Sequence, residues 1–327
     1  MSTTDDLRHL IESTTALNSS FSKQLPGLQV GIDSTSLGEY KVCPRKYLYG
    51  IILGYQPNET SVHLTFGLHV HKALERYEHR RAAGDDHEAA LQHVVRELLK
   101  DTWDSKRQRA WASTDPNKNR GTLLRTVVWY LDRFENDSME TVILASGKPA
   151  VELSFRFDSG YKSVASGEPF VFCGHIDRIA RFNGMTVILD PKTTKGSLGT
   201  YFFNSFTPGN QFSMYALAGQ VAFQQKISMI IVDGIQVLVG DSRFQRGLAP
   251  RPPEVISEWH HEQGFWLAQM ESSARFLTWP GNDKSCNQYG GCPFRGVCEK
   301  APKSRHQWLQ DNFTQRVWDP LQSRGEI

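Results

Sequence analysis

The spacing of apolar residues changes along the chain, from a helical period of about 3.6 to a strand period of 2. Leu91, Val94, Val95 and Leu98 recur at helical spacing and predict one long helix over 85–111. The Ser34–Ser36 segment has the residues of a helix N-cap and predicts that a helix begins there. Similar patterns predict further helices over 5–16, 66–81, 122–135, 210–225 and 255–277.

Between these helices lie shorter apolar runs that are typical of strands. Residues 240–253 are rich in Pro and Gly and are expected to form a loop or hairpin tip. Helices and strands together predict an α/β core with helical additions. The expected strands cover 150–157, 170–180, 185–192 and 228–239, the first three of them antiparallel.

Two carboxylates and a lysine stand near the ends of adjacent predicted strands. Asp190 and Lys192 share one face because side chains alternate along a strand. Hairpin pairing would bring Asp177, on the preceding strand, beside Asp190. Two carboxylates that close repel each other unless a cation lies between them, and a divalent metal is the usual answer. The alternative, which the short Asp-x-Lys pattern favours when taken alone, is a surface salt bridge of Asp177 with Arg178 or Lys192.

Two pairs of residues at helical i, i+4 spacing carry further chemistry. His71 and Glu75 share a helix face, and a neutral histidine ligates transition metals and tolerates Mn²⁺. The alternative is a partly exposed helix histidine. Gln211 and Tyr215 would hold a phosphate or a base near the metal, or else Tyr215 packs under the sheet. Glu152 either lies behind the metal site or is an exposed carboxylate on an edge strand.

Three of the five cysteines cluster within thirteen residues: Cys286, Cys292 and Cys298. A four-coordinate site needs one more thiolate, and Cys43 is the best choice. Thiolates suit Zn²⁺ or an iron–sulfur cluster, and the alternative is four unlinked thiols. An odd cysteine count argues against a disulfide framework. Cys173, inside an apolar strand, is expected to be a small buried residue.

The bulk properties narrow the class of protein. The chain has 327 residues and a net charge of +2, a balance that neither demands nor excludes a nucleic-acid partner. No apolar run is long enough for a membrane span, and the N-terminus lacks the pattern of a secretory signal. We therefore expect a soluble, cytoplasmic protein without a membrane partner. A G-x4-G-K-[S/T] phosphate loop is absent from the sequence, so no helicase motor is expected.

In their order along the chain, these motifs resemble the RecB/AddB-type branch of the PD-(D/E)XK nuclease superfamily that carries a four-cysteine iron–sulfur cluster. CRISPR-associated RecB-like exonucleases belong to this branch. The resemblance spans roughly 34–300. It departs from the family at Pro191, where a larger apolar residue is usual, and in the five-residue gap between Cys286 and Cys292. The matching segments are 36–47, Gly67-x3-His71-x3-Glu75, Gly174-His175-Ile176-Asp177, Asp190-Pro191-Lys192-Thr193, Gln211-x3-Tyr215 and Cys292-x5-Cys298.

The resemblance implies a restriction-endonuclease-like fold, a mixed central sheet flanked by helices, with a helical insert and a C-terminal segment stapled by the cysteine cluster. It implies an N-terminal extension over 1–33, a nuclease domain over 34–300 and a basic tail over 301–327. Within the domain, the insert would cover about 84–147, the core about 148–240, and the last helix with the cysteine cluster 254–300.

The resemblance also implies metal-assisted phosphodiester hydrolysis. His71, Asp177, Asp190 and the carbonyl of Pro191 would hold Mg²⁺ or Mn²⁺, and Lys192 would orient or help deprotonate the attacking water. Glu75 and Glu152 would stand behind these ligands, and Gln211 and Tyr215 would position the strand. Cys43, Cys286, Cys292 and Cys298 would bind a [4Fe-4S] cluster, with structural Zn²⁺ as the alternative. The basic residues expected to neutralise phosphates are Arg45, Lys46, Lys195 and Arg295.

The function implied is that of a DNA exonuclease acting on single strands or free ends, in a bacterial or phage-infected cell. Its setting would be recombination, repair, phage DNA processing or CRISPR adaptation, with a helicase or a recombination or adaptation protein as a possible partner. The alternative from another class is a nuclease fold that has lost turnover and only clamps DNA or a partner. A further alternative is a structural or redox-sensing protein built around the cysteine cluster.

Overall fold

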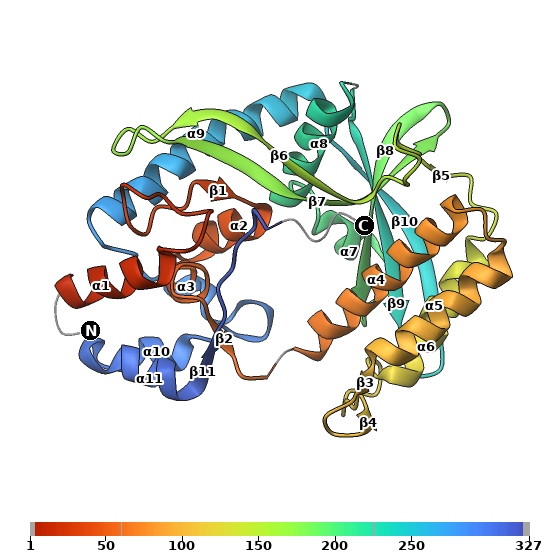
Figure 1. Cartoon of the computed structure of the whole chain (residues 1–327), viewed down its shortest axis with the longest axis horizontal. Coiled ribbons are helices and arrows are strands. Elements are labelled where there is room, and N and C mark those ends of the chain that lie inside the picture. The colour runs from red at the N-terminus through yellow and green to blue at the C-terminus, as the bar shows by residue number, and fades with distance from the viewer. Residues whose placement is uncertain (1–3, 60, 225, 323–327) are drawn as a thin grey trace. The chain divides into compact units, whose positions relative to one another are not determined.

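The structure is a computed structural model that describes residues 4–59, 61–224 and 226–322. The chain divides into two compact units, each made of separate stretches of sequence (Figure 1). Unit 1 comprises Met1–Glu59, Ser154–Gly174 and Ser257–Ile327, and unit 2 comprises Thr60–Leu153 and His175–Ile256. The domain boundaries expected from the sequence stay predictions, and the two units are described separately below.

A mixed sheet forms the centre of unit 2. The strand β8 (Met185–Thr194) pairs antiparallel with β7 (Pro169–Phe182) and parallel with β9 (Met229–Val237). The strand β10 (Ser242–Pro250) pairs antiparallel with β9, and β7 also pairs with β6 (Val151–Lys162) and the short β5 (Glu140–Thr141). The predicted mixed sheet of a restriction-endonuclease-like fold is therefore confirmed.

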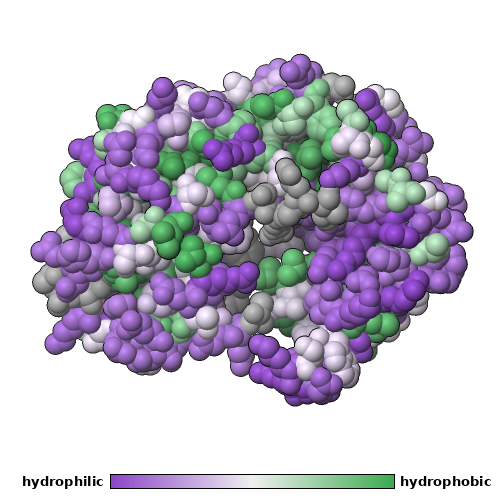
Figure 2. Space-filling model, in the orientation of Figure 1, coloured by the Kyte–Doolittle hydropathy of each residue, from purple (hydrophilic) through white to green (hydrophobic). Residues whose placement is uncertain are grey.

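Helices cover both faces of this sheet. The helices α4 (Val62–Ala82), α5 (His87–Asp101) and α6 (Arg120–Arg133) share one apolar cluster with Ile235 and Val237 of β9. The opposite face carries α8 (Asn210–Phe223), where a Cβ on Gly219 would lie 3.5 Å from Ile188 of β8. Because alternate strand residues point to opposite faces, even-numbered residues of β8 point toward α8. Hydrophilic residues cover much of the outer surface of α5 and α6 (Figure 2).

Two local predictions were wrong, each for a clear physical reason. The helix expected over 85–111 ends at Asp101, because Asp104 accepts hydrogen bonds from the N–H groups of Lys106 and Arg107 and closes a hairpin of β3 (Trp103–Asp104) and β4 (Arg109–Ala110). The loop or hairpin tip expected over 240–253 is largely the strand β10, which the β9 ladder holds despite its Gly and Pro content. The helix expected to begin at the Ser34–Ser36 segment does begin at Ser34, with Asp33 as its N-cap, whose side chain accepts from the N–H of Ser36.

Unit 1 combines short helices with two small strand pairings. Its strand β1 (Gly31–Ile32) runs parallel to β7 at Val171 and Phe172, and β2 (Tyr55–Pro57) pairs antiparallel with β11 (Phe313–Gln315). No helix in the described part of the chain is long and apolar enough to cross a membrane. The helices and helical turns that belong mainly to unit 1 are α1 (Thr4–Thr15), α2 (Ser34–Val42), α3 (Pro44–Tyr47), η1 (Leu48–Ile52), α9 (Pro253–Arg275), η2 (Asp283–Ser285), η3 (Gln288–Gly290), α10 (Arg295–Cys298), η4 (Pro302–Ser304) and α11 (Arg305–Asn312).

Candidate active site

The two acidic motifs meet in unit 2 where β7 and β8 separate. Their antiparallel register pairs Arg178 with Leu189, which sets Asp177 opposite Asp190 as the next step of the ladder. Lys192 lies two residues further along β8 on the same face, with its Nζ 2.6 Å from Oδ2 of Asp190. Strand alternation and hairpin register are thus sufficient to gather these three charges.

His71 reaches this group from α4. Its Nδ1 lies 3.2 Å from Oδ1 of Asp177. Burial opposes the charged imidazole, but the carboxylates of Asp177 and Asp190 outweigh it and raise the pKa of His71 to about 9. Burial likewise opposes the charged form of Asp177, but His71 lowers the pKa of this carboxyl to about 2. The metal-free protein therefore holds an ion pair where the sequence predicts metal ligands.

Asp190 is the most deeply buried member of the group. Its Oδ2 is paired with Nζ of Lys192, and its Oδ1 has no hydrogen-bond partner among the described residues. Burial, aided by the nearby Asp177, outweighs Lys192 and raises the pKa of Asp190 to about 7. Lys192 is itself buried, but the two carboxylates raise its pKa. The site thus holds a buried carboxylate that one cation satisfies only in part.

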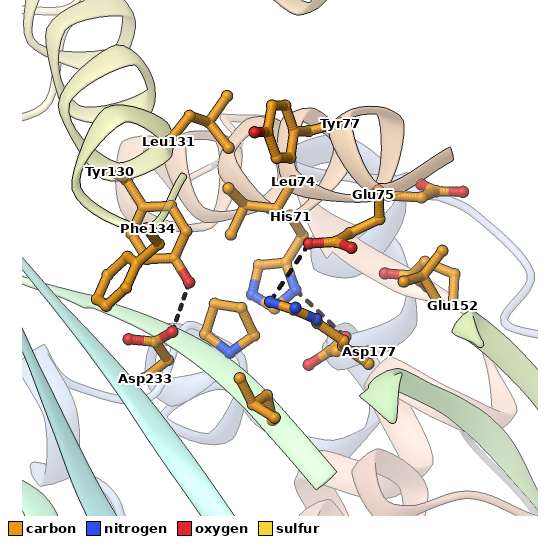
Figure 3. A pocket seen from close by; sticks show the side chains of 15 residues that line it. His71, Leu74, Glu75, Tyr77, Tyr130, Leu131, Phe134, Glu152, Asp177 and Asp233 are labelled. Atoms are coloured by element: carbon orange, nitrogen blue, oxygen red, sulfur yellow. Dashed lines mark hydrogen bonds and ion pairs between the residues drawn. The ribbon is translucent and has the colours of Figure 1, made fainter. Parts of the chain in front are cut away.

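Glu152 lies closer to the site than its predicted place behind the ligands. One ligand atom each from His71, Glu152 and Asp177 lie within 4.8 Å of one another, the spacing of a metal-binding group (Figure 3). Glu152 adopts φ +45°, a left-handed conformation that is unusual for a non-glycine residue and costs on the order of 1 kcal/mol. The fold tolerates this conformation at the point where β6 brings the carboxylate to the site.

A cavity of about 40 Å³ adjoins these residues within unit 2. It lies between the sheet and the helices α4 and α6, and both acidic and apolar side chains line it (Figure 3). Glu75, predicted to stand behind the ligands, lines this cavity beside Glu152 and Glu78. One imidazole and several carboxylates are the donors that Mn²⁺ accepts and, for the oxygens, Mg²⁺ prefers. The donor set and the only partly satisfied Asp190 therefore fit a divalent cation.

Pro191 does not disrupt the sheet. The β7–β8 ladder reaches Leu189, whereas the β8–β9 ladder continues to Thr194 and pairs Pro191 with Asp233. Pro191 therefore lies where β8 is paired mainly on one side, which is the position that a strand proline tolerates. The residue also lines the cavity beside His71 and Asp177.

Gln211 and Tyr215 extend the site along α8. Nζ of Lys192 donates to Oε1 of Gln211 at 3.1 Å, and Nε2 of Gln211 donates to the Tyr215 hydroxyl at 2.9 Å. Burial raises the pKa of Tyr215 well above its usual range, so this hydroxyl stays protonated. These two hydrogen bonds hold the Lys192 side chain in place beside the carboxylates.

The four basic residues predicted to bind phosphates are spread over both units. In unit 1, Lys46 pairs with Glu39 at 2.8 Å, the Arg45 backbone N–H donates to Pro280, and Arg295 is exposed and contacts Glu299. In unit 2, Lys195 pairs with Asp115 at 2.9 Å.

Sequence reasoning missed Lys118, whose Nζ donates to the hydroxyl of Thr193 next to Lys192. Burial lowers the pKa of Lys118 to about 8. The loop over 112–119 that carries this lysine has no regular periodicity that would have revealed it.

The predicted cluster cysteines all belong to unit 1, where each is a free thiol. The backbone N–H of Asn282 donates to Sγ of Cys43 at 3.3 Å, and Sγ of Cys286 contacts the carbonyl of the same residue at 3.8 Å. The N–H of Cys292 donates to the carbonyl of Cys286, and burial, together with the nearby Cys298 and Cys43, raises the pKa of the Cys292 thiol. N–H donors to sulfur are a usual feature of thiolate–cluster sites.

The sequence model of the PD-(D/E)XK nuclease superfamily matches residues 34–299. Because this match covers most of the chain, the protein belongs to the PD-(D/E)XK nuclease superfamily. Members of this superfamily are nucleases that use divalent metals, so the protein is assigned to the class of metal-dependent nucleases. No curated protein matches the chain.

Three solved structures are similar to this chain at low sequence identity. The putative exonuclease of Eubacterium rectale shares 10% identity with a TM-score of 0.48, covering 79% of this chain and 86% of that protein. SSO0001 shares 13% identity with a TM-score of 0.36, covering 90% and 93%. LHK-Exo in complex with dAMP shares 14% identity with a TM-score of 0.28, covering 65% and 94%.

Proposed function

We propose that this protein is a metal-dependent exodeoxyribonuclease of the RecB-like type, acting on single-stranded DNA or on free DNA ends. The observation that carries the proposal is the buried group of Asp177, Asp190 and Lys192, in which two carboxylates lie together and Lys192 is the one cation paired with Asp190. A purely structural ion cluster would satisfy both oxygens, because an unsatisfied buried carboxylate is costly. The order of the sequence motifs supports the RecB-like type and the preference for ends.

Each residue of the site has a proposed role. His71, Asp177, Asp190 and the Pro191 carbonyl would hold Mg²⁺ or Mn²⁺, with Glu152 as a further ligand. The bound cation would supply Lewis-acid activation of water and phosphate. Lys192 would orient the attacking water and offset negative charge on the transition state, held in place by Gln211 and Tyr215. Lys195, Lys46, Arg45 and Arg295 would neutralise neighbouring phosphates, so that binding weakens as salt rises.

The proposed setting is a bacterial or phage-infected cell, in recombination, repair, phage DNA processing or CRISPR adaptation. A helicase or a recombination or adaptation protein is the proposed partner, in line with the resemblance to RecB-like nucleases. The test of the function is degradation of end-labelled single- and double-stranded DNA with Mg²⁺ or Mn²⁺, by wild type, Lys192→Ala and Asp190→Ala. Cutting by wild type alone supports the proposal. DNA binding without cutting would instead favour an inactive clamp.

We also propose that Cys43, Cys286, Cys292 and Cys298 bind a [4Fe-4S] cluster with a structural role. The contacts of Cys43 and Cys286 with Asn282 support a shared site, because they bring together cysteines that are 243 residues apart in sequence. The test is visible absorption with iron, sulfide and zinc analysis of protein purified without oxygen. Iron and sulfide in equal amounts support the cluster, and one zinc per chain would replace it with a structural zinc site.

A further inference from the structure

The segment between Lys192 and Gln211 forms a closed loop on the proposed catalytic site. Lys192 lies two residues before the end of β8 and Gln211 lies in the first turn of α8, and their side chains are hydrogen-bonded at 3.1 Å. The short helix α7 (Thr200–Asn204) lies within this loop. Any residue that α7 exposes therefore lies on a loop whose two ends are residues of the proposed site.

Aromatic side chains fix α7 to the sheet. A Cβ on Gly234 would lie 2.8 Å from Leu198 and 3.1 Å from the ring of Phe202, so both side chains rest on this glycine. Gly234 is the register partner of Lys192 on β9, and register partners point to the same face of a sheet. The ring of Phe202 therefore lies on the face that carries Lys192 and Asp190.

A second glycine and a buried arginine complete the anchor. A Cβ on Gly247 of β10 would overlap the ring of Phe203. The carbonyl of Phe206 accepts from Nη2 of the fully buried Arg251 at 2.8 Å, and the Phe206 ring stacks on Phe212 of α8 at 5.7 Å. These contacts hold α7 as a fixed platform rather than as a loose loop.

Tyr201 is the aromatic residue of this platform that points to solvent. It is 94% exposed, whereas the rings of Phe202, Phe203 and Phe206 are partly buried and contact one another. An exposed tyrosine on a rigid support presents a flat face at little cost in conformational entropy. On the same segment, Lys195 lies between Lys192 and Tyr201 in sequence, where it is half-exposed and paired with Asp115 at 2.9 Å. Exposed aromatic faces combined with basic residues along a groove are the features with which proteins bind single-stranded nucleic acids.

We propose that Tyr201 stacks on a base of the substrate strand and so positions an unpaired nucleotide beside the scissile phosphate. This inference rests on the proposed nuclease function and deepens it, because it selects a single-stranded substrate at the site. Stacking is tolerant of base identity, so Tyr201 adds affinity without sequence preference. A duplex keeps its bases stacked on one another and offers the ring no free base face.

The test compares wild type with Tyr201→Ala, Tyr201→Phe and Tyr201→Trp. Binding of a fluorescent single-stranded oligonucleotide is measured with a chelator present, so that no substrate is cut, and kcat and KM are measured with Mg²⁺ or Mn²⁺ added. Tyr201→Ala is expected to weaken binding by about 5- to 100-fold and to raise KM more than it lowers kcat. Tyr201→Phe and Tyr201→Trp should bind like wild type. Trp103→Ala, which removes a half-exposed aromatic from the β3–β4 hairpin, is the matched control and should change nothing.

A set of oligonucleotides, each with one abasic position, separates stacking of Tyr201 on one base from a general weakening of oligonucleotide binding. At one position the missing base should weaken binding to the Tyr201 protein and leave the Tyr201→Ala protein unaffected. Equal binding by Tyr201→Ala and wild type would overturn the inference while leaving the nuclease proposal intact. The exposed Tyr201 ring would then bind another partner, such as a protein. Equal weakening at every abasic position would also overturn it. If wild type neither binds nor cuts DNA, the proposed function fails and the inference fails with it.

Discussion

Two clusters of buried charge lie on the same sheet of unit 2 and differ in how completely their charges are satisfied. The balanced cluster consists of Glu78, Asp137, Arg178, Asp233, Arg246 and Tyr130. Arg246 binds Asp137 through two hydrogen bonds of 2.8 and 2.7 Å and also donates to Asp233, which accepts from the Tyr130 hydroxyl. Arg178 adds a second cation, 3.3 Å from Glu78 and 3.8 Å from Asp137. Three carboxylates thus face two guanidinium groups. Each carboxylate is paired with a guanidinium group, although Oδ1 of Asp233 has no hydrogen-bond partner among the described residues.

The carboxylate site consists of His71, Glu152, Asp177, Asp190 and Lys192. It lies close by, since Asp233 pairs in register with Pro191, the neighbour of Asp190 and Lys192. Here three carboxylates share one lysine and one histidine, and Asp190 is held only by its ion pair with Lys192. Both clusters therefore set three carboxylates against two cations. They differ because guanidinium groups pair with every carboxylate of the first cluster, whereas Asp177 and Asp190 of the second lie close enough to repel each other. A bound cation would relieve this repulsion.

The largest expected effect is on catalysis, through Asp190→Asn. The substitution removes a proposed metal ligand, and we expect the rate of DNA hydrolysis to fall by roughly a thousandfold or more. Because it also removes a buried carboxylate that Asp177 repels, the free energy of unfolding of the metal-free protein should stay equal or rise. Single-turnover cleavage and urea unfolding measure the two quantities. Loss of stability together with activity would make the carboxylate site structural and remove the contrast with the balanced cluster.

Asp137→Asn should give the opposite result. Breaking a buried, doubly hydrogen-bonded pair leaves Arg246 under-compensated, and we expect a loss of about 3 kcal/mol in the free energy of unfolding. The rate per folded molecule should not change. Asp241→Asn is the matched control, because its pair with Arg243 is exposed and screened by solvent, so its loss should change the stability little. If Asp137→Asn and Asp241→Asn cost the same, the balanced cluster does not stabilise the fold.

Glu152→Gln tests which carboxylates bind the metal. If Glu152 is a ligand, the affinity for Mn²⁺ measured by titration calorimetry should fall by about 10- to 100-fold. Glu75→Gln is the control, because Glu75 lines the same cavity but does not belong to the group of ligand atoms within 4.8 Å. Equal losses of Mn²⁺ affinity for the two variants would mean that the cavity attracts the metal through its total charge. A loss for Glu75→Gln alone would make Glu75 the ligand in place of Glu152.

The sequence predicted the carboxylate site better than the balanced cluster. Asp177, Asp190 and Lys192 belong to one hairpin, so that strand alternation alone places them together. Asp233 and Arg246 are also register partners in one hairpin, that of β9 and β10, but residues 240–253 were expected to form a loop or hairpin tip, so this pairing was not predicted. Asp137 lies in a loop 109 residues before Arg246, and no local period encodes that contact.

A similar limit explains Glu152 and Tyr201. Glu152 reaches the ligand group through a left-handed backbone conformation, which the local sequence gives no reason to expect. The role of Tyr201 depends on Gly234 and Gly247, which are distant in sequence and leave room for the neighbouring phenylalanines. By contrast, His71 was predicted near the carboxylates because its motif has a fixed place in the family order.

The smallest effect separates the two clusters by the sign of their response to pH. Burial opposes the charged form of Asp137, but Arg246 overcomes it and lowers the pKa of this carboxyl below 3.8. A depressed folded-state pKa contributes stability that is present above the unfolded-state pKa and is lost as pH falls through the folded-state pKa. The stability difference between wild type and Asp137→Asn should therefore be constant from pH 7 to pH 5 and shrink below pH 4.

Asp190 should respond in the other direction, because burial raises its pKa to about 7. The stability that a raised carboxyl pKa contributes is present below the unfolded-state value and is lost as pH rises through about 7. In metal-free protein with a chelator present, wild type should therefore lose stability relative to Asp190→Asn between pH 4 and pH 8. Urea unfolding of both pairs over this range measures the two slopes. Slopes of the same sign would show that Asp137 and Asp190 respond alike to pH. The raised pKa of Asp190 would then no longer support a cation at the carboxylate site.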